Sequence, residues 1–242
     1  MGCARTHGGA ALGSLITYRC LVFRYCRRPV GLHSAYSRLD ILRRTVILDR
    51  MPRPSVKEEI VEAALKVLHQ RGFNATGVQD ITDAAGVPKG SFYNHFESKE
   101  ALGLVALERY WEGALRSLEV LKNTDMMPVA RLKSYFRRLN ELARKLKYRP
   151  GCMIGNLSIE MTDQSPAMRE RLAAILAKWS GAIEACVKEA QADGSVRRDL
   201  DAKAIGAFLL NSWEGAVLRS KVDRSNAPFD IFEKIVFSSL AS

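Results

Sequence analysis

Residues 77–99 read GVQDITDAAGVPKGSFYNHFESK, a stretch in which two helical patterns meet at a tight turn. The first pattern has small or apolar residues at three- and four-residue spacing: Val78, Ile81, Ala84 and Ala85. This spacing predicts a short helix with one apolar face. Gly86 can adopt the left-handed conformation that ends a helix, and Pro88 suits the first turn of the next one. The stretch therefore predicts two short helices joined at Gly86.

The second helix is expected over residues 88–95, with Val87, Phe92 and Phe96 facing inward. The remaining residues would form an outward polar face: Lys89, Gly90, Ser91, Tyr93, Asn94 and His95. Such a face fits the major groove of DNA, because polar side chains meet base edges there, and Lys, Ser and Tyr also bond phosphate oxygens. The small Gly90 would let the helix approach the DNA closely. On composition alone, an ordinary helical hairpin on a protein surface explains the stretch equally well.

Residues 84–102, AAGVPKGSFYNHFESKEAL, resemble nearly residue for residue the helix-turn-helix signature of the Tet-repressor family of bacterial transcription regulators. The resemblance implies a DNA-binding regulator and assigns Lys99 a phosphate contact. Many family members have Ser or Thr in place of Gly77 and Arg in place of Gln79, and this chain departs from both. Thr76 or Gly77 is expected to cap the first helix, and Thr76 is a further candidate DNA contact. Gln79 either bonds a base edge or phosphate, or is simply solvated.

The net charge of the 242 residues gives little support to DNA binding, although it is +11. Residues 1–50 hold nine Arg, no Lys and two Asp, a net of +7, so the other 192 residues carry 28 basic and 24 acidic side chains, a net of +4. The five cysteines are scattered without a CxxC pair: Cys3, Cys20, Cys26, Cys152 and Cys186. This pattern disfavours a disulfide framework or a metal site and fits a reducing cytoplasm. No apolar run reaches the roughly 18 residues that span a bilayer, so we expect a soluble protein without cofactor or metal.

Residues 1–50 lack sustained periodicity, and we interpret them as a disordered or non-native extension that precedes a functional start at Met51. An Arg-rich, acid-poor targeting peptide is one alternative, but glycine and proline breaks interrupt any amphipathic helix. A basic arm that strengthens nonspecific DNA contact is another.

The rest of the chain reads as helices throughout, which predicts an all-α fold. Ser55 and Glu58 form a capping-box pattern at the start of a first helix that ends at Gly72. Ser98 caps a long helix that runs to about residue 122. The later helical patterns cover residues 128–146, 153–162, 166–194, 201–222 and 229–240. We expect a three-helix DNA-binding domain over residues 51–98 and a larger ligand-binding and dimerisation domain over residues 99–242.

The last two helices carry more apolar residues than one face each would need: Ile205, Phe208, Leu209, Trp213, Val217, Ile231, Phe232, Ile235, Val236 and Phe237. Burying more than one face requires a partner, and the family resemblance implies a two-fold homodimer in which these helices form a four-helix bundle. The two identical DNA-binding domains of such a dimer would match a pseudo-palindromic operator.

In the family that the chain resembles, the helices after the reading unit enclose a cavity for a small-molecule inducer. The candidate lining residues are Trp111, Phe136, Met153, Met161 and Trp213. The plainer alternative is that all five belong to the core. Lys221 shares a helix face with Trp213 at eight residues' separation, which would present its amine toward the same cavity.

Cys152 follows Arg149-Pro150-Gly151 at a helix start, where the helix dipole and nearby cations are expected to lower the pKa of a thiol. Cys186 lies mid-helix among apolar residues and is expected to be a core thiol. The segments RPGCMIGNLSIE (149–160) and WEGAVLRSK (213–221) resemble those of family members that respond to reactive electrophiles or unsaturated acids. We therefore predict that Cys152 senses an electrophile or oxidant, with Lys221 as its neighbour; the alternative is an unreactive residue at a helix start.

Three functions remain open on these grounds. The first is a homodimeric repressor that an inducer releases from its operator. The second is a nonspecific nucleoid protein, which would bind all sequences alike with a steep salt dependence. The third is an α-helical enzyme, which is disfavoured because the chain lacks a phosphate-binding glycine loop, an HExxH motif and a nucleophile elbow.

Overall fold

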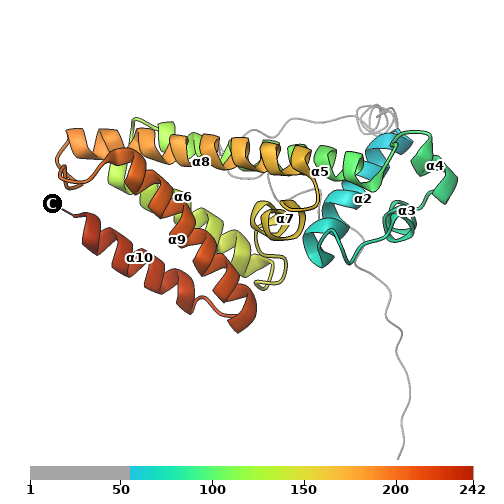
Figure 1. The fold of residues 1–242 in the computed structure, drawn as a ribbon. Coiled ribbons are helices and arrows are strands. Elements are labelled where there is room, and N and C mark those ends of the chain that lie inside the picture. Colours follow the sequence, from blue (N-terminus) through green and yellow to red (C-terminus); the bar gives the residue numbers. More distant parts are fainter. Residues whose placement is uncertain (1–54, 242) are drawn as a thin grey trace, which may run out of the picture. The chain divides into compact units, whose positions relative to one another are not determined.

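The computed structural model describes residues 55–241, and all the regular structure in this range is helical (Figure 1). The expectations for residues 1–50 lie outside the described range. The elements are α2 (Val56–Arg71), α3 (Val78–Ala85), α4 (Lys89–Tyr93), α5 (Lys99–Leu118), the 3-10 helix η1 (Glu119–Lys122), α6 (Pro128–Lys145), α7 (Met153–Met161), α8 (Pro166–Ala192), α9 (Ala202–Asp223) and α10 (Ala227–Leu240). The all-α prediction is confirmed for this part of the chain.

Helix α2 begins and ends where the sequence predicts. The Ser55 hydroxyl accepts a hydrogen bond from the Glu58 N–H at 3.3 Å, and Gly72 ends the helix with φ of 89°. Only this half of the predicted capping box forms, because the Glu58 carboxylate pairs instead with Arg109 of α5. Arg109 also bonds Glu62 at 2.8 Å, so α2 is held to α5 by charge as well as by its buried apolar face.

Two predictions within residues 77–99 need correction. Ala84 is exposed, whereas Thr82 is buried, because positions 78, 81, 82 and 85 form one face of a 3.6-residue helix and position 84 points away from it. Burial of Thr82 costs little, since its hydroxyl bonds the carbonyl oxygens of residues 78 and 79. Helix α4 is also shorter than the predicted 88–95: it ends at Tyr93, after which the N–H groups of His95 and Phe96 both bond the Phe92 carbonyl.

Helix α7 lies in contact with α2, α5 and α8 (Figure 1). The chain reaches it through a predicted break after α6, where Lys147, Tyr148 and Gly151 all have positive φ. Glycine adopts this conformation without strain, while the two side-chain-bearing residues are held in it by the turn that reverses the chain. The break therefore places Cys152 at the N-cap of α7.

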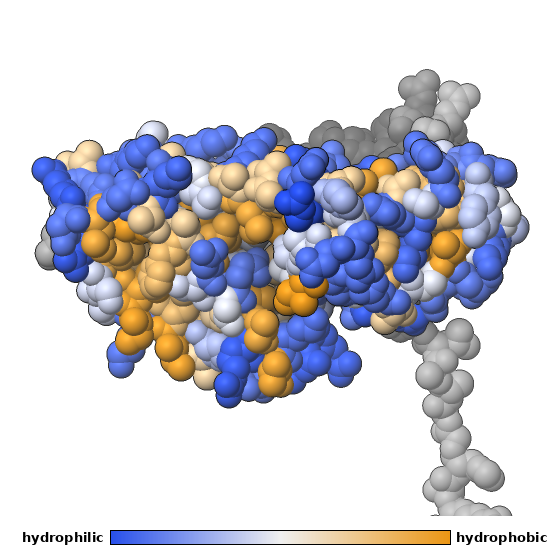
Figure 2. All heavy atoms as spheres, viewed as in Figure 1, coloured by the Kyte–Doolittle hydropathy of each residue, from blue (hydrophilic) through white to orange (hydrophobic). Residues whose placement is uncertain are grey.

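Helices α8 and α9 pack backbone against backbone near Gly206. A Cβ added to this glycine would stand 3.0 Å from the Glu184 nitrogen and the Ser180 oxygen of α8. The outward face of α9 and α10 carries exposed hydrophobic side chains: Phe208, Leu218, Val222, Ile231 and Ile235, each between 56% and 71% exposed. Figure 2 shows hydrophobic side chains gathered over these two helices.

Within residues 55–241, no helix is long and apolar enough to cross a membrane.

Candidate DNA-reading face and sensing site

The turn between α3 and α4 has the predicted form. Gly86 lies in the left-handed region with φ of 71°, and the Val87 N–H bonds the Thr82 carbonyl at 3.1 Å to close the end of α3. Phe92 and Phe96 are 0% and 5% exposed, so α4 is fixed on the core by its aromatic side. The opposite side of this short helix is then forced outward.

We call this outward surface the reading face. Lys89, Gly90, Tyr93, Asn94 and His95 are exposed, and Ser91 is half-buried. Tyr93 is 60% exposed, although its ring packs edge-on against the buried Phe92 with 5.1 Å between centroids. The six residues thus present one ammonium group, two hydroxyls, an amide and an imidazole on a rigid support.

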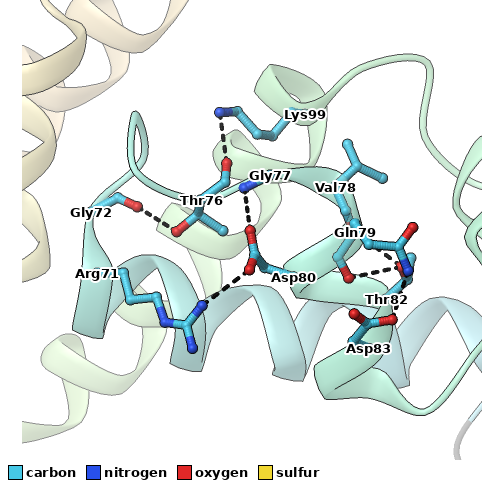
Figure 3. Close-up of polar contacts among 10 residues, drawn as sticks. All are labelled: Arg71, Gly72, Thr76, Gly77, Val78, Gln79, Asp80, Thr82, Asp83 and Lys99. Carbon is cyan, nitrogen blue, oxygen red and sulfur yellow. Dashed lines mark hydrogen bonds and ion pairs between the residues drawn. The ribbon is translucent and has the colours of Figure 1, made fainter.

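Two candidates at the start of α3 differ from one another (Figure 3). Gln79 is exposed, and its amide donates to the Asp83 carboxylate at 2.6 Å. Thr76 is only 1% exposed, and its hydroxyl donates to the Gly72 carbonyl at 2.7 Å. The side chain of Thr76 therefore faces the protein rather than DNA, and the cap of α3 is Gly77.

Lys99, to which the family resemblance assigns a phosphate contact, also has a local structural role, although a cation in the first turn of a helix opposes the helix dipole. Its ammonium donates to the Thr76 carbonyl oxygen at 2.9 Å (Figure 3). It also donates to the Phe73 carbonyl oxygen at 3.0 Å and lies 4.2 Å from the centroid of the Phe73 ring. These partners more than offset the unfavourable helix dipole, because hydrogen bonds from a charged group are stronger than neutral ones. Lys99 thus fixes the loop between α2 and α3.

Asp80 fixes the other side of the same loop. One carboxylate oxygen accepts the Gly77 N–H at 2.7 Å, and the other accepts from Arg71 at 3.1 Å (Figure 3). The start of α3 is therefore tied to the end of α2, and the reading face has a defined orientation on the three-helix unit.

The predicted cavity-lining residues all lie in the hydrophobic core. Trp111, Phe136, Met153, Met161 and Trp213 are each 5% exposed or less. The three aromatic rings among them form a chain of contacts. The centroid distances are 6.4 Å from Phe136 to Trp213, 5.7 Å from Trp213 to Trp179 and 6.0 Å from Trp179 to Trp111. These contacts are the core packing that the sequence left as the alternative.

Cys152 is buried at 4% exposure, and the expected lowering of its pKa is wrong. Burial raises the pKa of the thiol well above its usual value, and the carboxylate of Glu214 raises it further. Arg149 and the dipole of α7 do not overcome these two effects. Cys186 is also buried, and burial raises its pKa to about 11, as expected for a core thiol.

Several polar groups surround Cys152, and we call them the Cys152 cluster. The Tyr110 hydroxyl donates to its sulfur at 3.9 Å. The Glu214 carboxyl lies nearby, since a Cβ on Gly155 would stand 2.7 Å from Glu214 Oε2 and 3.9 Å from Cys152 Cβ. Lys221 lies beside the preceding residue, since a Cβ on Gly151 would stand 3.2 Å from Lys221 Cδ. His69 of α2 donates through Nε2 to the Gly151 carbonyl at 2.8 Å.

Three groups in the cluster have pKa values shifted from their usual ones. Burial raises the pKa of Glu214 from 4.5 to about 7, and raises that of the Tyr110 hydroxyl well above its usual value. Burial lowers the pKa of His69, and the charge of Lys221 lowers it further. At neutral pH the cluster therefore contains a neutral imidazole, a neutral thiol and a carboxyl close to its midpoint.

Two segments of the chain match known protein families. Residues 60–104 match the family described as "Bacterial regulatory proteins, tetR family", and residues 128–236 match "Tetracyclin repressor-like, C-terminal domain". The HTH-type transcriptional repressor DhaR of Mycobacterium sp. strain GP1 is 41% identical over 191 residues, covering 78% of this chain and 94% of DhaR. The chain belongs to the TetR family.

Other proteins are also similar to this chain in sequence and in structure. The transcriptional regulator AcuR of Cereibacter sphaeroides is 33% identical over 178 residues, covering 73% of this chain and 81% of AcuR. The crystal structure of a regulatory protein TetR from Rhodobacter sphaeroides superposes with a TM-score of 0.72 at 32% identity, over 76% of this chain and 97% of that one. The crystal structure of the reduced form of Escherichia coli NemR superposes with a TM-score of 0.68 at 25% identity, over 78% of this chain and 98% of NemR. The chain is therefore a DNA-binding transcriptional repressor under small-molecule control.

Sequence reasoning missed Glu214, Tyr110 and His69 as members of the Cys152 cluster. One signal was present: Glu214 is the only acidic residue between positions 202 and 222, inside a strongly apolar TetR-family helix. A carboxyl in such a place is either functional or paired. Tyr110 and His69 carry no such signal, because each fits an ordinary position on an amphipathic helix.

Replacing Lys99 with Met should lower the free energy of unfolding by about 1–3 kcal/mol, because the carbonyls of Phe73 and Thr76 lose their charged donor. The matched control is Lys89→Met on the exposed reading face, which should change stability by no more than about 0.5 kcal/mol. Urea denaturation of both variants without DNA measures the difference. Equal stability of Lys99→Met and the parent protein would show that the ammonium has no structural role.

Proposed function

We propose that this TetR-family protein is a homodimeric repressor that reads a pseudo-palindromic operator with the face of α4 and is released when a small electrophile or oxidant reacts with Cys152. The observation that carries the DNA-binding part is the reading face itself. Exposed polar residues stand there directly opposite Phe92 and Phe96, which fix α4 on the core. Such a rigid, polar, convex helix fits the major groove.

The reading face divides into two kinds of contact. Tyr93, Ser91 and His95 carry groups that bond phosphate oxygens and set the position of the protein on the duplex. Lys89 and Asn94 have the donor groups suited to base edges, with guanine and adenine as their preferred partners. Gln79 joins the second kind once it releases Asp83. Gly90 adds no side chain, which leaves room for the DNA backbone near the start of α4.

Lys89→Ala should relax the preference for particular bases by about 1–3 kcal/mol, whereas Tyr93→Phe should weaken binding to all sequences to a similar extent. The probes are the duplex selected from a random library by the parent protein and variants of it with single base changes. Lys178→Ala, on the exposed side of α8, is the control and should alter neither quantity.

If instead Lys89→Ala weakens binding to all sequences and Tyr93→Phe relaxes the base preference, then Lys89 contacts phosphate and Tyr93 contacts a base. Binding of the parent protein to the selected and random duplexes with equal affinity would support the nucleoid alternative instead.

The apolar face of α9 and α10 supports the dimer. Phe208, Leu218 and Val222 on α9 and Ile231 and Ile235 on α10 are all exposed, and leaving all five in water would be costly. The two helices pack against each other in one chain, so that a second copy related by a two-fold axis would complete a four-helix bundle. The excess of apolar residues in the sequence predicts a partner for this face, and the family resemblance implies the two-fold four-helix bundle.

Ile235→Asp should convert the dimer into a monomer and weaken operator binding about 100-fold or more, because the two reading units no longer bind as one molecule. Analytical ultracentrifugation and gel-shift titration measure the two effects. Ile159→Asp is the matched control, since Ile159 is 77% exposed on α7, outside the α9 and α10 face. A dimeric Ile235→Asp variant would place the interface elsewhere.

The position of α7 supports Cys152 as the sensing residue. Cys152 begins this helix, and the preceding Gly151 carbonyl accepts from His69 of α2. Near the other end of α7, the Glu160 carboxylate accepts the Asn74 N–H at 2.8 Å, in the loop before α3. An adduct on the buried thiol has to displace α7, and both bonds to the reading unit move with it.

Cys152→Ser should retain operator binding and lose its release by N-ethylmaleimide or hydrogen peroxide, while Cys186→Ser should respond like the parent protein. Gel-shift titration with and without each reagent measures this. Release of the Cys152→Ser protein at parent-like reagent concentrations would rule out this cysteine as the sensor.

A further inference from the structure

The proximity of Glu214 to Cys152 leads to an inference that rests on the proposed role of Cys152 and extends it to a second residue. The thiol is buried, and its pKa lies well above the usual value, so very little thiolate exists at neutral pH. The thiolate is the nucleophile in reactions with electrophiles. A buried sensor of this kind therefore needs a group that removes the proton during the reaction.

We propose that Glu214 is this general base and accepts the proton of the Cys152 thiol as the sulfur adds to a conjugated alkene. Three features of its position support the role. Its carboxyl lies beside Cys152 across Gly155, its Oε1 atom is buried without a hydrogen-bond partner, and it takes part in none of the ion pairs found among residues 55–241. A structural carboxylate in a protein interior would have such partners.

Gly155 makes the approach of the carboxyl possible. A Cβ at this position would stand 2.7 Å from Glu214 Oε2 and 3.9 Å from Cys152 Cβ. The missing side chain therefore leaves a space in the first turn of α7 that the carboxyl of α9 fills, next to the thiol. Any larger residue would push the carboxyl away from the sulfur.

The other titratable groups of the cluster suit different tasks. Tyr110 on α5 keeps its proton, because burial raises its pKa, and donates to the sulfur, which stabilises the charge that develops there. His69 on α2 already donates to the Gly151 carbonyl. Lys221 on α9 lies against Gly151, with its ammonium 3.8 Å from the Cβ position of that residue. Glu214 is the group among them that both lies beside the thiol and can accept its proton.

The reaction balances without an oxidant or a further reactant. The S–H bond breaks and its proton moves to the Glu214 carboxylate, while the sulfur forms a bond to the β-carbon of an alkene conjugated to a carbonyl group. The alkene electrons move to the carbonyl oxygen and give an enolate. The proton held by Glu214 is then delivered to the α-carbon, so the carboxylate is restored and the product is a thioether. A pKa of about 7 suits both transfers at neutral pH.

The test is the rate at which N-ethylmaleimide modifies Cys152 in the full-length parent protein and in Glu214→Gln, followed by peptide mapping between pH 5.5 and 9. The parent rate should rise through a pH of about 7, where Glu214 ionises. Glu214→Gln keeps the shape of the side chain but cannot accept a proton, so its rate at pH 7.5 should fall about 100-fold and the rise near pH 7 should disappear. Circular dichroism checks that the variant is folded.

If Glu214 acted only through its charge, without accepting a proton, Glu214→Gln would raise the rate of modification instead of lowering it. The Glu214 carboxylate raises the pKa of the thiol, so removing its charge would by itself speed the modification. A Glu214→Gln rate equal to or above that of the parent, or a complete absence of the Cys152 adduct in the parent, would overturn the proposal. If Glu214→Gln fails to fold, Gly155→Ala provides the second test: it keeps both reacting groups, displaces the carboxyl and should also slow the modification. Failure of the sensing function is recognised separately, as an adduct on Cys152 that leaves the operator bound.

Discussion

The ammonium group of Lys99 holds the loop on which the geometry of the DNA-reading unit depends. This charge bonds the carbonyls of Phe73 and Thr76 and packs against the Phe73 ring. The loop connects α2 to α3. Within it the Thr76 N–H donates to the Phe73 carbonyl at 3.2 Å, while the Thr76 carbonyl takes its donor from Lys99. With the loop fixed, α3 starts at a defined point, Gly86 sets the turn, and α4 carries its polar residues outward.

The same loop is also bonded to α7, the helix that begins at Cys152. Glu160 of α7 bonds the Asn74 N–H, and a Cβ on Gly72 would stand 2.5 Å from the Glu160 carboxylate. His69 makes a second connection at the start of α7, next to Cys152. A glycine thus allows close approach at Gly72, as another does at Gly155 for Glu214. If Cys152 acts as proposed, its coupling to DNA binding requires only that α7 move as one short rigid body.

Local patterns predicted the elements of the fold well. The caps at Ser55 and Ser98, the helix ends at Gly72 and Gly86, and the break before Cys152 all stand where the sequence places them, because each depends on the conformational preferences of one or two residues. The errors arose where a residue's role depends on a partner distant in the sequence. Lys99 finds its acceptors 26 and 23 residues earlier.

The sequence by itself determined that this chain is helical, that it carries a helix-turn-helix with a polar outer face, and that its last helices present more apolar surface than a monomer needs. Periodicity and capping encode these properties locally. Only the tertiary structure decided the chemistry of Cys152. A helix start next to Arg149 predicts an acidic thiol, but the fold buries this sulfur and places Glu214 against it from 62 positions further along the chain, and both effects raise its pKa. Burial and long-range charge act through space, and no pattern of neighbouring residues records them.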